Sequence, residues 1–517
     1  MKYSDDIFQL VKSLSKQEKT YFRFFVSSIS QGDEDNYLKF FDEITKQASK
    51  FQDYDEDKVR SLKFSGKFLK NLSYHKNYLY NMILSSMTFY NREKKIYFNV
   101  INLITQCQFL TDKFLYNQAL KILLKAKKIA SENELFELLY EVLSIEKSIY
   151  NHTLNLEEAK EKHSKVTDEQ KSVLGLINTN FEYNILYKQI GYLIKRSGTG
   201  FSRKEEIMKS YEDIVSSKLM SNESYAKSFQ SKFMFKSIML QYHLSFGDFE
   251  KGNKFGEEIV VLFEENFEKS ENFYERYIMS LNNLLTTQIR TQRYEEVEST
   301  VLKMRRIEKD YSDKMAEKEK VFIFYSISVL MISKYMACCE FDKLKSHISN
   351  IMKEFVKYEN QIILQQRIIL YYFLGTSNFV IAEYEDCIKW MGKIINSEKN
   401  AFSEDYQCLS RIVFLLSYYE LKYFDSMEYV LKSTYHFLSK RKRVYKYENI
   451  ILKYLRKSFR IKTEKELYRM FEEMQHELLK ISNDKFEKNA FDTFNILYWL
   501  ESKLERIPLT EVLISKS

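Results

Sequence analysis

The side chains that most often bind metals or act as nucleophiles are few and scattered along this chain. The seven histidines are His75, His152, His163, His243, His347, His436 and His476. No two are spaced i, i+4 and no H-E-x-x-H sequence occurs, so the pattern of a helical zinc site is absent. The five cysteines are Cys107, Cys338, Cys339, Cys387 and Cys408, without a C-x-x-C pair. This odd number and spacing indicate neither a disulfide framework nor a zinc site, and are typical of a reducing cytosol.

Motifs of nucleophilic, phosphoryl-transfer and dinucleotide chemistry are also absent. The chain has no G-x-S-x-G, no kinase signature and no Rossmann glycine pattern. Its glycine-rich stretch, RSGTGFSRKE from Arg196 to Glu205, lacks the G-K-[ST] of a phosphate loop. We interpret it as a flexible loop and place a hinge at residues 196–204. We therefore expect no enzymatic activity, no catalytic residues, no cofactor and no metal.

The strongest electrostatic feature is the basic segment KRKRVYKYENIILKYLRKSFRIK, residues 440–462. On a helix, its apolar residues would share one face: Tyr447, Ile451, Tyr454 and Leu455. Its basic residues would share another: Lys446, Lys453, Lys457 and Arg460. This separation predicts that the apolar face packs on the protein and that the basic face contacts an acidic partner. The alternative interpretation is a solvated charged face, the usual role of charge runs.

A second candidate contact region lies in the first hundred residues. Ser15 and Glu18 have the spacing of a capping box, which predicts a helix start in SLSKQEKTYFRFF. Further helices are expected in residues 36–48, in 55–64 and from Ser73 onward. If these helices formed a helix-turn-helix, the side chains facing base edges would be Tyr74, His75, Lys76, Asn77 and Tyr80. The interpretation that we favour is an N-terminal helical cap whose tyrosines pack inward.

The elements that must position all these residues are helices. The chain has 517 residues, of which 44% are hydrophobic and 29% charged, as in a folded protein. It contains one proline and eleven glycines, far fewer than an average chain of this length. Because proline and glycine break helices and mark loops, their scarcity predicts long helices joined by short turns. The fold is predicted to be all-α.

An aromatic residue followed by an acid returns in the second half of the chain. It begins at Phe249, Tyr294, Phe341, Tyr384 and Phe424, at intervals of 40 to 47 residues. Apolar residues follow at +3, +7 and +10, for example Cys387, Met391 and Ile394, so each repeat predicts one apolar helical face. A longer apolar segment precedes each aromatic residue. Helix pairs at such a period are typical of an α-solenoid, in which each pair is stable only when stacked on the next.

The repeats resemble tetratricopeptide repeats (TPRs). YNQALKILLKA carries the aromatic Tyr116 and the small residues Ala119 and Ala126 of that motif's second helix. Gly375 stands nine residues before Tyr384, as the motif's first-helix glycine does. The period exceeds the motif's length of about 34 residues, so we expect longer helices. The units that begin at Tyr116, Leu156 and Tyr211 are weaker than the later ones. The resemblance covers residues 111–438 and implies a concave surface that binds a protein or peptide.

The ends of the chain and its charge bear on location and partners. The N-terminus MKYSDDIFQL does not have the pattern of a signal peptide. The most apolar run, VFIFYSISVLMIS, is shorter than the roughly 20 residues that cross a bilayer, so we expect a core helix and no membrane insertion. The net charge is +8 on 80 basic and 72 acidic residues, a mild excess that does not by itself indicate nucleic acid. The predicted location is cytoplasmic.

These observations predict three parts: an N-terminal helical domain or cap at 1–100, TPR-like repeats at 101–438, and a C-terminal helical cap at 439–517 that contains the basic segment. The predicted function is a non-enzymatic scaffold or adaptor that binds a protein or peptide on the concave surface of the repeats. The alternative is a nucleic-acid-associated or transcriptional regulator that uses the N-terminal helix-turn-helix-like region and the basic segment.

Overall fold

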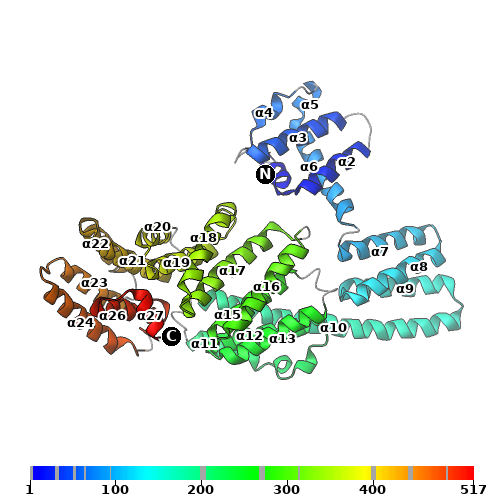
Figure 1. The fold of residues 1–517 in the computed structure, drawn as a ribbon. Helices are drawn as coiled ribbons and strands as arrows, with labels where there is room; N and C mark the ends of the chain where they lie inside the picture. The colour runs from blue at the N-terminus through cyan, green and yellow to red at the C-terminus, as the bar shows by residue number, and fades with distance from the viewer. Residues whose placement is uncertain are drawn as a thin grey trace. The chain divides into compact units, whose positions relative to one another are not determined.

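The computed structural model describes the chain apart from residues 1–3, 29–33, 51–53, 63, 65, 93–94, 198–204, 267–273, 313–314, 398–402, 440–445, 485–486 and 517. Within the described residues the regular structure is helical throughout, with no strand (Figure 1). This confirms the all-α prediction. The chain divides into two compact units, Met1–Asn178 and Thr179–Ser517, which are considered separately below.

The first unit contains two sets of helices, each with its own core. The first set is α1 (Ser4–Ser13), α2 (Lys16–Ser28), α3 (Glu34–Lys50), α4 (Glu56–Arg60), α5 (Gly66–Lys70) and α6 (Leu72–Asn91). Its core includes Phe8, Phe22, Phe41 and Ile83. The second set is α7 (Ile96–Asp112), α8 (Tyr116–Glu132), α9 (Phe136–Thr153) and the first part of α10 (Leu156–Ser197). Its core includes the predicted small residues Ala119 and Ala126.

The predicted capping box at the start of α2 is present. The Glu18 backbone N–H donates to Ser15 Oγ at 3.2 Å, and the Ser15 N–H donates to Glu18 Oε2 at 2.7 Å. These two bonds satisfy donors that the first turn of a helix would otherwise leave without partners. The helix expected in residues 55–64 is α4, which occupies Glu56–Arg60.

The second unit is built from helix pairs and a C-terminal group (Figure 1). The paired helices are α12 (Phe229–Phe246) with α13 (Phe249–Glu265), α15 (Tyr274–Arg290) with α16 (Tyr294–Asp310), α17 (Glu317–Ala337) with α18 (Phe341–Tyr358), α19 (Leu364–Val380) with α20 (Tyr384–Ile395), and α21 (Ser403–Glu420) with α22 (Phe424–Ser439). The short α11 (Glu205–Val215) precedes them. The C-terminal group is α23 (Lys446–Ser458), α24 (Glu464–Ile481), α25 (Lys488–Thr493), α26 (Ile496–Glu505) and α27 (Leu509–Lys516).

Each recurring aromatic residue begins the second helix of its pair, as predicted. The acid that follows it lies in the first turn, where the helix dipole favours negative charge. In α20 the +3, +7 and +10 residues Cys387, Met391 and Ile394 are buried. The weaker unit proposed at Tyr211 is wrong, because Tyr211 lies inside α11 and not at a helix start. Its buried ring fits the core but does not mark a repeat.

The turn between paired helices has one backbone geometry in both units. The residue two positions before the second helix has a positive φ: Phe114, Glu134, Gly247, Gln292, Cys339, Ala382 and Lys422. The next residue donates its N–H to the carbonyl five positions earlier, at 2.8–3.0 Å. This is the Schellman motif, which satisfies carbonyls at the end of a helix. The fixed turn gives successive pairs the same local connection.

First helices stack on first helices along the second unit. Helix α17 contacts both α15 and α19, and α19 also contacts α21. Each first helix also packs on its own second helix, and α13 and α20 contact the next first helix. Gly375 in α19 shows how close this packing is, since a Cβ there would lie 2.6 Å from Met391 Cε in α20. A side chain at this position, where the TPR motif has its first-helix glycine, would require the end of the Met391 side chain to shift.

The C-terminal helices belong to the same core as the later helix pairs. One continuous cluster of buried residues runs from Val321 to Leu500. The Tyr447 hydroxyl donates to the Phe494 carbonyl at 2.7 Å, and Trp499 Nε1 donates to Glu420 Oε1 in α21 at 2.6 Å. The three parts predicted from sequence, with boundaries near 100 and 438, stay a prediction. The observed boundary falls inside the continuous α10.

Helix α17 contains the most apolar run of the chain. By length and hydropathy it is the one helix among the described residues that could cross a membrane. More than half of its most apolar window is nevertheless buried in the protein. Val321, Ile323, Ile327 and Ile332 all lie in the core, which is the position expected of a core helix.

Candidate functional site

Three stacked first helices of the second unit leave one face partly open. Helices α15, α17 and α19 contact one another in series, and each also packs on its own second helix, so the remaining faces carry less buried residues. The half-buried or exposed residues of these faces are Met279, Asn282, Asn283 and Thr286 of α15, Phe322, Tyr325, Ser333 and Met336 of α17, and Ile369, Phe373 and Thr376 of α19. We call this set the inner-helix face. It follows helical spacing in each of the three helices.

The inner-helix face combines apolar rings with amide groups that are free to bind. The Phe322 and Tyr325 rings lie 6.3 Å apart. The side-chain amides of Asn282 and Asn283 form no hydrogen bond with other described residues, whereas the Thr286 hydroxyl donates to the Asn282 carbonyl at 2.9 Å. A side-chain amide offers two donors and one acceptor, so it can pair with a peptide backbone. Sequence reasoning missed both asparagines; their signal was an amide pair inside the otherwise apolar segment SLNNLL.

The C-terminal group packs on α19 through residues that do not belong to the inner-helix face. The Tyr372 hydroxyl in α19 donates to the Thr493 carbonyl at 3.4 Å, and the Phe379 and Phe494 rings lie 5.6 Å apart. The Tyr372 ring also contacts Tyr406 of α21 at 5.2 Å. Burial raises the pKa of Tyr372 well above its ordinary value, so its hydroxyl stays protonated and donates. Tyr372 and Phe379 are buried, whereas Ile369, Phe373 and Thr376 of the same helix are partly exposed.

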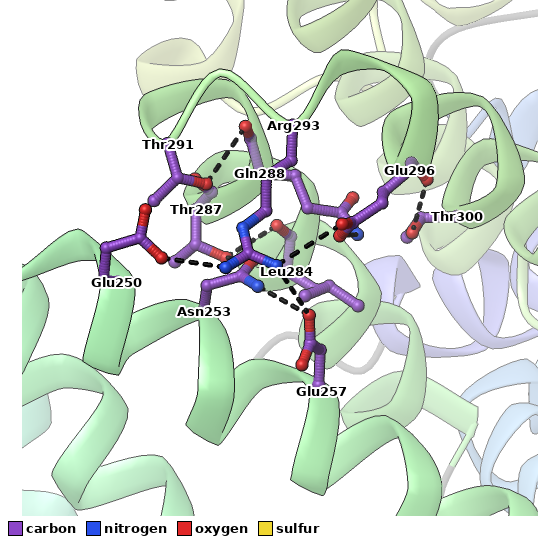
Figure 2. Close-up of polar contacts among 10 residues, drawn as sticks. All are labelled: Glu250, Asn253, Glu257, Leu284, Thr287, Gln288, Thr291, Arg293, Glu296 and Thr300. Carbon is purple, nitrogen blue, oxygen red and sulfur yellow. Dashed lines mark hydrogen bonds and ion pairs between the residues drawn. The ribbon is translucent and has the colours of Figure 1, made fainter.

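A polar network joins the first two helix pairs of the second unit (Figure 2). The Thr287 hydroxyl donates to Asn253 Oδ1 at 3.0 Å, and Asn253 Nδ2 donates to Glu257 Oε1 at 2.6 Å. Arg293, in the turn before α16, lies 2.9 Å from Glu250 and 3.4 Å from Glu296. The hydrogen bond to Glu250 raises the pKa of Arg293. Each carboxylate here has a donor, so the network connects α13, α15 and α16 and resembles no general acid–base pair.

Buried lysines in the second unit are also structural. Lys236 of α12 lies 2.8 Å from Glu223 and 2.7 Å from Glu258. Burial acts to lower its pKa, but the two carboxylates outweigh that effect and raise the pKa. A lysine that remains charged at neutral pH is a poor nucleophile. Lys334 of α17 has the same arrangement with Glu298 and Glu340.

Cys387 is a buried thiol in the core of the second unit. Burial raises the pKa of Cys387 to about 12, and the Ser417 hydroxyl donates to its sulfur at 3.1 Å. Such a thiol is not a reactive nucleophile. No group of three or more His, Cys, Asp or Glu side chains among the described residues could hold a metal.

The basic segment separates into two faces as predicted. Tyr447, Ile451, Tyr454 and Leu455 are buried, whereas Lys446, Lys453, Lys457 and Arg460 are exposed. Helix α23 ends at Ser458, so Arg460 lies in the following turn and not on the helix. The part of the segment at residues 440–445 lies outside the described residues, as does the predicted hinge except for Arg196 and Ser197 at the end of α10.

Two of the four predicted partner-binding cations already have partners within the protein. Lys453 Nζ lies 2.7 Å from Glu477 Oε1, and Lys457 Nζ lies 2.6 Å from Glu473 Oε2, both in α24. Lys446 and Arg460 form no ion pair with other described residues. Lys453 and Lys457 are thus already paired within the protein, while contact of this face with an acidic partner stays a prediction.

The five N-terminal side chains expected to face bases lie in different surroundings. The Tyr74 ring is 64% exposed and Asn77 is exposed. His75 Nδ1 lies 2.7 Å from the Tyr37 hydroxyl. Lys76 is buried and paired with Glu56, and Tyr80 packs against the core. Tyr74 does not follow the expectation that the tyrosines pack inward, and Lys76 is not positioned to reach a ligand.

Comparison of the chain with protein-family models, with curated proteins and with solved structures finds no match.

Proposed function

We propose that this protein is a TPR-like scaffold that binds an extended segment of another protein on the inner-helix face. The observation that supports this most directly is the amide pair Asn282–Asn283 on α15, with the partly exposed rings of Phe322 and Tyr325 on the adjacent α17. A bound chain needs partners for its backbone N–H and C=O groups and an apolar surface for its side chains. The inner-helix face supplies both on neighbouring helices.

The dimensions of the face suit a short segment. Axes of packed helices lie about 8–10 Å apart, so α15, α17 and α19 together span roughly 16–20 Å. An extended chain rises about 3.3 Å per residue, so roughly six residues would cross all three helices. Side chains on one side of that segment would contact Phe322, Tyr325 and Phe373, while its backbone would pair with the asparagine amides. Because the scaffold helices are already packed, little conformational entropy is lost on its side of the complex.

A display library of random twelve-residue peptides tests this function. Peptides selected on the purified protein should bind the parent and should bind an Asn282→Ala/Asn283→Ala variant at least tenfold more weakly. The matched control is Asn350→Ala, an exposed amide on the second helix α18, which should bind as the parent does. Equal binding by all three proteins would exclude the inner-helix face as the site.

The nucleic-acid alternative predicts a different readout. A protein held on phosphates loses affinity steeply as salt increases, because each neutralised phosphate releases counterions. Binding of a selected peptide through rings and amides should change little between low and moderate salt. No contact among the described N-terminal residues favours the alternative over the scaffold, since Lys76 is committed to Glu56.

A further inference from the structure

A pocket of about 380 Å³ lies where the end of α21 and the start of α22 meet the turn between α23 and α24. Its apolar walls are the side chains of Tyr419, Phe424, Phe459, Ile461 and Leu467. The Phe424 ring is 44% exposed, so the pocket opens to solvent at that side. All of these residues belong to the second unit. They lie on α21 to α24 and the turn between α23 and α24, whereas the inner-helix face belongs to α15, α17 and α19.

The back of the pocket is rigid. The Tyr419 ring contacts Phe424 at 6.1 Å, Phe471 at 6.1 Å and Trp499 at 5.8 Å. Trp499 is in turn held by its hydrogen bond to Glu420, and Lys503 also pairs with Glu420. A side chain entering the pocket would therefore meet a preformed aromatic wall, which reduces the entropy lost on binding.

The charges at the pocket are unbalanced in favour of cations. Lys462 lines the pocket, and Arg460 lies between the lining residues Phe459 and Ile461. Both are exposed, and neither forms an ion pair with other described residues. The carboxylate that lines the pocket, Glu464, is paired with Arg506 at 3.2 Å. Within the basic segment, α24 thus pairs with Lys453 and Lys457, whereas Arg460 and Lys462 beside the pocket have no ion pair with described residues.

We propose that this pocket accepts one aromatic or large aliphatic side chain from an acidic protein segment, whose carboxylates pair with Arg460 and Lys462. The inference rests on the proposed scaffold function and names a second, chemically distinct contact for its partner. A buried apolar anchor in a preformed pocket supplies most of the affinity of such contacts, and rim charges mainly set the association rate and the choice of partner. The pocket volume is at the small end of ligand sites, which fits a single side chain better than a larger ligand.

Fluorescence polarisation with three labelled ten-residue peptides tests the proposal. The first carries a central tryptophan flanked on both sides by aspartates and glutamates. The second replaces the tryptophan with serine, and the third replaces the acids with lysines. The first should bind the full chain at least tenfold more tightly than either of the others.

Two variants locate that binding. Arg460→Glu/Lys462→Glu should weaken binding of the acidic tryptophan peptide at least tenfold, and Phe459→Ala should also weaken it. The matched control is Lys345→Glu/Lys353→Glu, two exposed cations on α18 without ion pairs to described residues. It should bind as the parent does. Melting temperatures of all variants identify any loss that comes from unfolding, and the charge-reversal pair lies on the surface, where folding is least affected.

The outcomes separate this proposal from the scaffold function. Equal binding of the tryptophan and serine peptides would show attraction by charge alone and would overturn the pocket. No binding of the acidic tryptophan peptide, or undiminished binding to Arg460→Glu/Lys462→Glu, would overturn it as well. In each of these cases the scaffold function would still be decided by the Asn282→Ala/Asn283→Ala comparison, which alters a different set of helices.

Discussion

The Lys457 ammonium lies 2.6 Å from the Glu473 carboxylate, across the hairpin of α23 and α24. Lys453 and Glu477 form a second pair in the same hairpin. The hydrogen bond from Lys457 lowers the pKa of Glu473, as that from Lys453 lowers the pKa of Glu477. The basic face of α23 is therefore matched by an acidic face of α24, and much of its charge is used inside the molecule.

This match predicts the effect of charge reversal. Lys453→Glu/Lys457→Glu places four carboxylates along one hairpin and should lower the melting temperature. Adding Glu473→Lys/Glu477→Lys exchanges the signs and should restore most of the loss, because the pairs are re-formed. Melting curves at low and high salt check this, since screening should shrink the difference. A reversal variant that melts like the parent would show that the pairs do not contribute to stability.

At the left-handed turn residues, the free energy of unfolding should fall when glycine is replaced by alanine and rise when alanine is replaced by glycine. Gly247→Ala should lower the free energy of unfolding by about 1 kcal/mol, because a Cβ is strained at positive φ. Ala382→Gly should raise it by up to about 1 kcal/mol at the equivalent turn, since the strain is relieved. The control is Ala337→Gly at an exposed, helical position of α17, where glycine should instead destabilise. Denaturant unfolding followed by circular dichroism measures all three, and destabilisation by Ala382→Gly would contradict the turn geometry.

The contact between Gly375 and Met391 predicts a double-mutant effect. Gly375→Ala should cost about 1 kcal/mol, because the end of the flexible, buried Met391 side chain must move to a less favourable rotamer. In a Met391→Ala background the same change should cost less, since the space has been opened. Gly392→Ala is the matched control, because its Cβ would lie 3.8 Å from Phe414, an ordinary contact. It should be neutral or stabilising through helix propensity, and equal costs at both glycines would refute the close approach.

The ion pair between Glu359, which follows α18, and Lys393 of α20 predicts a pH-dependent contribution to stability. Glu359 accepts hydrogen bonds from Lys393 at 2.7 Å and from the Tyr371 hydroxyl at 3.0 Å, and chiefly the bond from Lys393 lowers its pKa. A lowered folded pKa means that the contribution is present above the ordinary value of 4.5 and is lost as the pH falls through the folded pKa. The melting-temperature difference between the parent and Glu359→Gln should therefore shrink as the pH falls below that ordinary value. A difference that stays constant down to pH 3 would show that ionised Glu359 is not responsible.

Local features of the fold could be predicted because they repeat in the sequence. The aromatic–acid pairs located the starts of α13, α16, α18, α20 and α22, since burial and the helix dipole act on neighbouring residues. The turn before each of these helices could not be predicted, because only Gly247 carries the residue type that a positive φ favours. At Gln292, Cys339 and Lys422 the strained positive φ is offset, because the N–H of the next residue donates a hydrogen bond to a carbonyl at the end of the preceding helix.

Features that depend on segments distant in the sequence were harder to predict. The basic face of α23 was visible in the sequence, but its partners Glu473 and Glu477 are fixed only by the α23–α24 hairpin. The boundary inside α10 has no composition change to mark it, because one helix continues through it. The pocket beside α22 joins residues from Tyr419 to Leu467, and the inner-helix face joins three helices, so neither forms a local motif.

Site-specific photocrosslinking tests the inner-helix face most directly. A benzophenone side chain placed at Phe322 of α17 should crosslink to a selected peptide, because the scaffold function puts the peptide across that ring. The same group at Val356, which is 81% exposed on α18, provides an equally accessible position off the face. We expect crosslinking at position 322 and none at position 356. We also expect unlabelled peptide to compete and abolish the crosslink. Crosslinking at 356 with none at 322 would contradict peptide binding on the inner-helix face.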